Sequence, residues 1–145
     1  MSCDTAFTRI AKPADEVFAF MSDVNRLGSW ALGSWNGTVD ETGLIRARSI
    51  KDGSPICVRI EAHPEMRLID YHVGSDPEHL VPRIFARIVE GSTFGAPNNE
   101  CGLVMSALRT EDMDDARWEL LIATHRVEVD MIRAMIESGY DHRSA

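Results

Sequence analysis

Hydrophobic and polar residues alternate through the middle of the chain, and this spacing predicts β-strands. A period of two residues is typical of a strand with one buried face. The alternating segments are separated by turn residues and cover 30–40, 43–52, 55–63, 66–74, 80–91 and 101–110. Asp52-Gly53 is a strong signal for a tight hairpin turn. Six consecutive strands with short links predict an antiparallel meander.

A different pattern precedes the meander. A first strand is predicted over 3–11, and Pro13 suits the first turn of the helix that follows, where its missing N–H costs nothing. A second, short helix is expected over 22–30, with Gly28 ending it. The chain therefore begins with one strand and two helices.

The longest helix is predicted over 114–138, with Gly139 as its stop signal. One face of this helix is apolar and carries Trp118, Leu121, Ile122, Val129, Ile132 and Ile136. His125 lies in the middle of that face, either as a core residue with an internal partner or as a ligand contact. Only the sheet is large enough to bury the face. We therefore predict an α+β fold over residues 1–145, of order β-α-α-β6-α, with a curved seven-stranded antiparallel sheet around a C-terminal helix.

The segment "RIAKPADEVFAFMSDVNRLGSW", residues 9–30, is the part of the chain that most resembles a known family. Together with the C-terminal helix it resembles the START-like superfamily of helix-grip proteins, also called the polyketide cyclase/dehydrase and lipid-transport group. The resemblance covers nearly the whole chain, but its motifs are structural. It implies a cavity between the concave sheet face and the long helix. Family members hold lipids, sterols, polyketides, plant hormones or ubiquinone there, and some catalyse ring cyclisation or dehydration.

Amino-acid composition excludes several classes of binding partner. The formal net charge is −8 and the 15 basic residues are scattered, which argues against nucleic acid and anionic lipid surfaces. No apolar run approaches the roughly 20 residues of a membrane span, so we expect no membrane insertion. No signal peptide is recognisable, and the three cysteines include no CxxC pair. We therefore expect free thiols and a cytoplasmic protein.

Motifs for cofactors and metals are missing from the sequence. It contains no GxxxxGK[ST], GxGxxG or HExxH motif, and its five histidines show no metal-ligand spacing. The resemblance brings no shared catalytic motif either. We therefore expect neither a cofactor nor a metal.

Alternation within the strands indicates which side chains face the predicted cavity. In 55–63 and 66–74 the apolar set points inward and includes Tyr71. A buried Tyr or His needs a hydrogen-bond partner, which another buried polar group, a water or a ligand can supply. The residues expected to contact a ligand are His125, Tyr71, Trp30, Trp118, Ile122, Val129, Val58, Ile60 and Met105.

The polar set of the same strands is expected on the outer face. It includes Asp70 and His72, and in 80–91 Arg83 and Arg87 are expected to point outward as well. A one-residue shift of the strand over 66–74 would turn Asp70 and His72 into the cavity beside Arg87, giving an acid–base group.

Three functions follow as hypotheses. The first is binding of a small hydrophobic or aromatic ligand, such as a lipid, a polyketide or a quinone-like molecule. The second is a polyketide cyclase or dehydratase that uses Asp70, His72 and Arg87 as catalytic residues. The third is a protein-interaction module. A homodimer is compatible with each of them.

Overall fold

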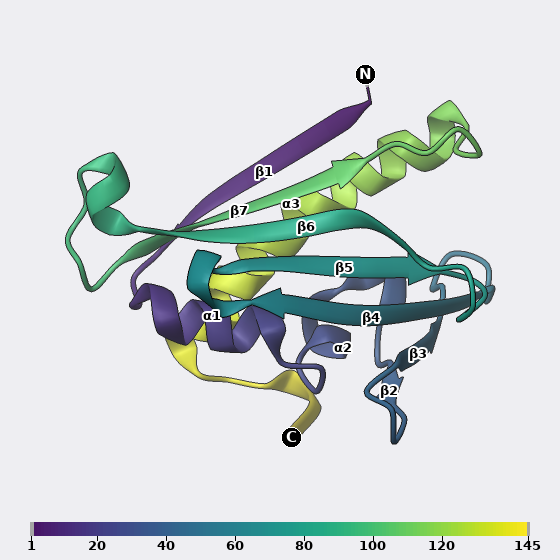
Figure 1. Ribbon diagram of the computed structural model, residues 1–145, viewed down its shortest axis with the longest axis horizontal. Helices are drawn as coiled ribbons and strands as arrows, with labels where there is room; N and C mark the ends of the chain where they lie inside the picture. The colour runs from purple at the N-terminus through teal and green to yellow at the C-terminus, as the bar shows by residue number, and fades with distance from the viewer. Residues whose placement is uncertain (1, 145) are drawn as a thin grey trace.

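The computed structural model describes residues 2–144 and contains one sheet of seven antiparallel strands (Figure 1). The strand order is β1-β7-β6-β5-β4-β3-β2. The strands are β1 (Cys3–Ile10), β2 (Thr38–Val39), β3 (Ile45–Arg48), β4 (Pro55–His63), β5 (Leu68–Gly74), β6 (Val81–Glu90) and β7 (Cys101–Leu108). The helices are α1 (Ala14–Ser22), α2 (Leu27–Trp30) and α3 (Asp115–Ser138), with 3-10 turns η1 (Leu32–Ser34), η2 (Pro64–Met66), η3 (Gly91–Phe94) and η4 (His142–Ser144). The predicted α+β fold and element order are confirmed.

Helix α3 lies across one face of the sheet (Figure 1) and is capped at both ends. The Asp114 carboxylate accepts a hydrogen bond of 2.8 Å from the Arg117 backbone N–H, which satisfies one of the free donors of the first turn. Gly139 ends the helix in a left-handed conformation, with φ 72°. The centre of the apolar face packs against β1 and β7. The edge of that face therefore lies over the middle strands.

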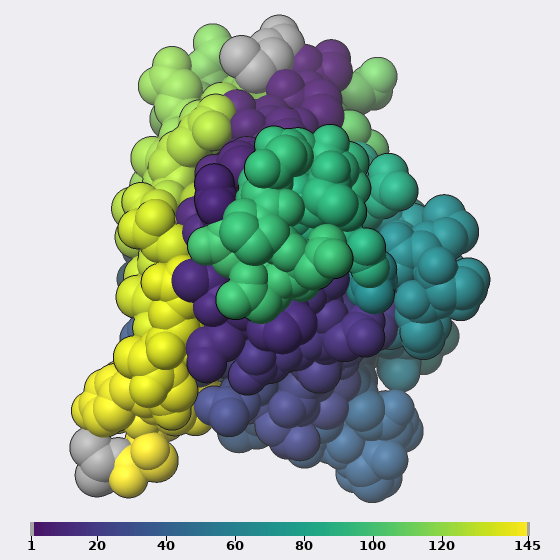
Figure 2. Space-filling model, turned by 90° about the vertical axis from the view of Figure 1, so that its left-hand side faces the viewer, coloured from purple at the N-terminus to yellow at the C-terminus, as the bar shows by residue number. Residues whose placement is uncertain are grey.

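Helix α1 packs against the sheet through buried Ala14, Val17 and Met21. Seen from the left-hand side of Figure 1, the purple segment of β1 and α1 lies between α3, in yellow, and the loop around η3, in green (Figure 2). The main core is continuous from α1 across the sheet to the C-terminal half of α3. The space left under α3 is therefore at its N-terminal half.

The strand predicted over 30–40 is mostly wrong. Within that range the chain forms the end of α2 and the turn η1, and only Thr38–Val39 pair as a strand. Gly28 lies inside α2 instead of ending it, because it touches the loop: a Cβ on Gly28 would meet the Gly37 backbone nitrogen at 2.8 Å. This close contact folds 27–37 back under α3.

A bulge interrupts the pairing of β5 with β6. Tyr71 is opposite Ile84, whereas Val73 is opposite Val81. The chain advances two residues on β5 and three on β6 between these pairs, so β6 carries the extra residue. Pro82 lies in the longer stretch and has no N–H for the ladder, which is a common reason for a bulge. Because of this bulge, Arg83 faces the side of the sheet that α3 covers, whereas the sequence predicted an outward position.

Within residues 2–144, no helix combines the length and the apolar character that crossing a membrane requires.

Candidate ligand-binding site

A cavity of about 120 Å³ lies between the sheet and the N-terminal half of α3. The sheet contributes Ile56, Val58, Tyr71, Val73, Arg83, Ile84 and Met105. Helix α3 contributes Leu121, Thr124, His125 and Glu128, and the α2–η1 segment contributes Leu27, Trp30, Ala31, Gly33 and Ser34. Most of this lining is apolar, so the few polar groups determine what the cavity recognises.

Glu128 is a polar residue of this lining that the sequence analysis missed. It is buried, and its side chain is 7% exposed. Oε2 accepts a 2.8 Å hydrogen bond from the Leu32 backbone N–H, which ties α3 to η1. Burial raises the pKa of the Glu128 carboxyl to about 8, although the Leu32 hydrogen bond acts in the opposite direction. At neutral pH this carboxyl is therefore mostly protonated.

His125 lies one helical turn before Glu128 and is buried as well. Burial lowers its pKa to about 4, with the positive charges of Arg83 and Arg126 acting in the same direction. Its Nε2 is 3.8 Å from Glu128 Oε1, too long for a hydrogen bond. Because burial favours the neutral form of both groups, we interpret this contact as one between neutral side chains and not as an ion pair.

Three nitrogens at the cavity have no hydrogen-bond partner among residues 2–144. They are Trp30 Nε1, Arg83 Nη1 and His125 Nδ1, each shielded from solvent. The Trp and Arg nitrogens are donors only, while the His nitrogen donates or accepts according to its tautomer. Buried polar groups in native proteins are nearly always paired. Within residues 2–144, Nδ1 of His125 is therefore left without a partner.

Tyr71 fixes one wall of the cavity. Its hydroxyl donates a 2.6 Å hydrogen bond to the Met21 backbone carbonyl, in the last turn of α1. Its ring contacts Trp30 edge to face, with centroids 5.8 Å apart. Burial raises the pKa of the Tyr71 hydroxyl, and the nearby Glu128 adds to this. Tyr71 therefore remains a neutral donor and its hydrogen atom is committed to Met21.

Replacing Tyr71 with phenylalanine is expected to destabilise the protein by about 1–3 kcal/mol, because the Met21 carbonyl would remain buried without a partner. Urea unfolding followed by circular dichroism measures the difference. Tyr140→Phe is the matched control, since Tyr140 is 60% exposed. Equal stability of the two variants would contradict this role for Tyr71.

Five of the residues predicted to contact a ligand line the cavity: His125, Tyr71, Trp30, Val58 and Met105. The other four lie elsewhere in the core. Trp118 belongs to a smaller cluster with Ala107 and Met113, against which Ile122 packs. Val129 lies in the main core and Ile60 packs against it. Three of the four, Trp118, Ile122 and Val129, lie on α3, which packs on β1 and β7 so that the cavity lies beside them.

The acid–base group expected from a shifted strand does not form. Burial alternates regularly along β5, with Ile69, Tyr71 and Val73 buried, so Asp70 and His72 lie on the outer face. Arg87 is exposed on the outer side of β6. The bulge lies in β6 instead, and it brings Arg83 into the cavity lining, where the sequence had predicted an outward position.

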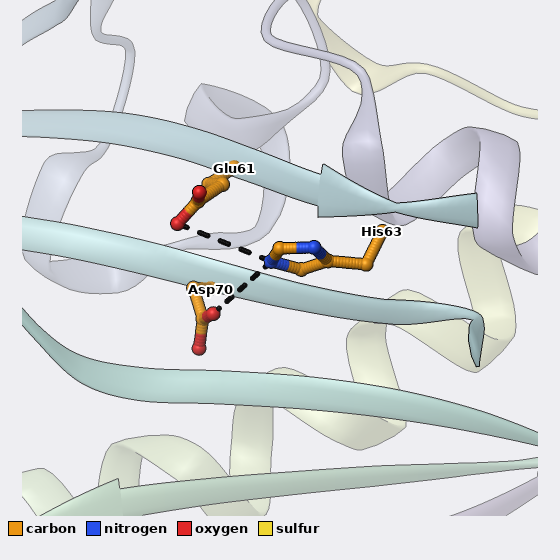
Figure 3. A group of neighbouring side chains, drawn as sticks. All are labelled: Glu61, His63 and Asp70. Atoms are coloured by element: carbon orange, nitrogen blue, oxygen red, sulfur yellow. Dashed lines mark ion pairs between the residues drawn. The ribbon is translucent and has the colours of Figure 1, made fainter. Parts of the chain in front are cut away.

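The outer face nevertheless gathers possible metal ligands that sequence spacing did not indicate (Figure 3). His63 Nε2 is 3.9 Å from Glu61 Oε1 and 3.4 Å from Asp70 Oδ2. His72 Nε2 lies 3.0 Å from the same Glu61 oxygen. The pairing of β4 with β5 creates this group, because Glu61 is directly opposite Asp70. It lies on the sheet face away from α3 (Figure 3) and is separate from the cavity.

No family model matches the sequence, and no curated protein sequence does either. Solved structures do match. The protein XoxI from Bacillus cereus has a TM-score of 0.70 at 17% identity, covering 94% of this chain and 96% of its own. Zhui aromatase/cyclase from a Streptomyces species has a TM-score of 0.62 at 17% identity, covering 99% and 95%. The Aha1 dimer from Colwellia psychrerythraea has a TM-score of 0.66 at 12% identity, covering 94% and 97%.

These similarities, over nearly the full length of each chain, confirm the predicted fold, a curved antiparallel sheet with a long C-terminal helix. At identities of 12–17% they establish the fold and leave the ligand open.

Proposed function

We propose that the protein binds a small, largely apolar ligand of about one aromatic ring in the cavity between α3 and the sheet. One observation carries the proposal: one nitrogen each of Trp30, Arg83 and His125 lies at this cavity without a partner among residues 2–144. Leaving such a group unpaired costs on the order of 1–3 kcal/mol. A ligand with oxygen acceptors would pair them.

The size of the cavity limits the ligand. An engineered protein cavity of roughly 150 Å³ accommodates benzene, so about 120 Å³ suits a single ring. A fatty acyl chain or a steroid needs more room. The proposal therefore favours a one-ring aromatic or quinone-like ligand, or one ring of a larger polyketide, over a lipid. The similarity to an aromatase/cyclase is compatible with this ligand class.

A thermal-shift titration tests the proposal. Phenol, benzyl alcohol and dodecanoic acid serve as two single-ring probes and one chain-like probe. We expect the first two to raise the melting temperature of the wild type in a saturable manner. Val58→Phe enlarges a side chain of the cavity wall and is expected to abolish the shift. Val127→Phe makes the same change at a position on α3 that is 49% exposed, and is expected to preserve the shift.

If Val58→Phe fails to fold, as judged by circular dichroism, Thr124→Leu fills the same cavity from the surface of α3. A ligand-induced shift that survives in a folded cavity-filling variant would show that the probes bind elsewhere and would refute the proposal.

Acid–base catalysis in the cavity is a second candidate, favoured by the protonation states of Glu128 and His125. At neutral pH a mostly protonated carboxyl and a neutral imidazole line the same cavity, so one group has a proton to donate and the other can accept one. Such a pair suits the enolisation or dehydration of a β-dicarbonyl compound, the chemistry of a polyketide cyclase or dehydratase. The candidate replaces Asp70, His72 and Arg87, which lie outside the cavity.

Deuterium exchange into 1-phenyl-1,3-butanedione, followed by NMR in D₂O, tests this candidate. The wild type is expected to accelerate exchange over buffer, and Glu128→Gln and His125→Gln are expected to reduce that acceleration by about 10²-fold or more. Exchange at the buffer rate with wild-type protein would eliminate the enzyme and leave the binding function intact.

A further inference from the structure

We infer that the ligand carries a carboxylate bound by Arg83, so that its chemical class is a single-ring aromatic carboxylate. This inference rests on the proposed binding function and adds the charge of the ligand and the residue that selects it.

The backbone directs Arg83 to the cavity. In a regular strand Arg83 would share the outer face with Arg87, which is four residues further along β6 and exposed. The bulge between the Tyr71–Ile84 and Val73–Val81 pairs breaks this alternation, and both Arg83 and Ile84 line the cavity. Bulges commonly redirect a side chain next to a functional site.

The guanidinium of Arg83 has no anionic partner in the protein. Among residues 2–144 it makes no ion pair and no side-chain hydrogen bond, and its Nη1 is shielded from solvent. Asp112 is the acidic residue whose charge acts on it, but that carboxylate already accepts hydrogen bonds from Thr110 Oγ1 and from Arg117 Nη1, the latter at 3.3 Å. Burial lowers the pKa of Arg83, yet a guanidinium remains protonated in proteins. A guanidinium with one shielded, unpaired nitrogen, Nη1, therefore lies at the cavity.

The rest of the lining has no charge that would repel an anion at neutral pH. Glu128 is the acidic residue of the lining, and its pKa of about 8 keeps it mostly protonated. His125 is neutral, and the Tyr71 hydroxyl donates to Met21. The free N–H of Trp30 is a further donor for an oxygen of the ligand.

A carboxylate fits this arrangement better than other acceptors. It is planar and accepts two parallel hydrogen bonds from one guanidinium, which gives both strength and orientation. The apolar walls provided by Ile84 and Met105 leave room for a ring. The protein as a whole carries a net charge of −8, so anion binding has to come from this local cation and not from the overall field.

Isothermal titration calorimetry at pH 7 with benzoate, benzyl alcohol and benzylamine tests the inference, because the three probes share a ring and differ in charge. The wild type is expected to bind benzoate about 10-fold or more tightly than benzyl alcohol, as for a hydrogen bond to a charged group, and benzylamine most weakly. Arg83→Met should lose this preference while retaining binding of benzyl alcohol. Arg87→Met, the same change on the outer face of β6, should behave as the wild type.

The possible results separate this inference from the proposed function. Equal affinity of the wild type for benzoate and benzyl alcohol would overturn the role of Arg83 and leave ring binding intact. A benzoate preference that persists in Arg83→Met, or in Arg83→Gln if the methionine variant does not fold, would also overturn it. Failure of the wild type to bind any of the three probes would refute the proposed function and this inference together.

Discussion

Replacing Glu128 with glutamine is expected to make the protein more stable at alkaline pH, by roughly 4–5 kcal/mol above pH 8. The carboxyl has a pKa of about 8 in the folded protein against 4.5 in a free side chain. Between these two values the unfolded chain releases a proton that the folded protein keeps, so ionisation favours unfolding. The contribution of Glu128 is therefore complete below pH 4.5 and is lost as the pH rises through about 8. Glutamine keeps an oxygen for the Leu32 N–H and does not titrate.

Urea unfolding at a series of pH values between 4 and 9 measures this effect. Glu119→Gln is the matched control, because Glu119 is exposed on the same helix. We expect the difference between wild type and Glu128→Gln to grow from near zero at pH 4.5 and to level off above pH 8. A difference that is independent of pH would contradict a buried, protonated Glu128.

Replacing His125 with glutamine is expected to have the opposite pH dependence and to stabilise the protein at acid pH by about 3 kcal/mol. The pKa of His125 is about 4 in the folded protein against 6.5 in a free side chain. Between these values the unfolded chain binds a proton that the folded protein excludes. The stability contributed by a neutral His125 is therefore present above pH 6.5 and is lost as the pH falls through about 4.

The same unfolding series measures the second effect, with His79→Gln as control because the His79 side chain is 81% exposed. The two residues act against each other between pH 4.5 and 6.5, where a rising contribution from His125 offsets a falling one from Glu128. In each single variant, the free energy of unfolding should change with pH as the remaining titrating residue alone dictates. Parallel pH profiles for wild type and both variants would mean that neither group is buried in its neutral form.

The arrangement of the fold was largely predictable from local patterns. Alternation in β4 and β5, within a series of short segments separated by turn residues, indicated the meander, and the apolar face of α3 required a sheet to cover it. Gly139 correctly marked the end of α3. Prediction failed at 30–40, where a short segment ahead of a turn signal suggested a strand. The contact between Gly28 and Gly37, which folds this segment back, joins residues nine positions apart and leaves no periodic signal.

Two polar residues of the cavity, Tyr71 and His125, were predictable from the sequence. The positions of Glu128 and Arg83 depend on contacts between elements, which the pattern within one strand or helix does not contain. Tyr71 and His125 were found because each interrupts an apolar face. Glu128 was missed because a charged residue suggests solvent, although it lies seven residues after Leu121 and thus nearly above it on the helix. Arg83 was missed because its orientation depends on a bulge, and Pro82 within the strand was the available signal. The outer group of Glu61, His63 and Asp70 depends on the pairing of two strands.

The central claim is that a ring-sized ligand occupies the cavity beside Trp30, and indole N–H resonances test it most directly. The chain has three tryptophans, of which Trp30 lines the cavity, Trp118 lies in the smaller cluster and Trp35 stacks on His142. In a ¹H–¹⁵N correlation spectrum titrated with benzoate and with phenol, the Trp30 indole resonance is expected to shift in a saturable manner, and more than the other two. Saturable shifts at Trp35 or Trp118 with an unchanged Trp30 resonance, or no shift at any of the three, would contradict the account.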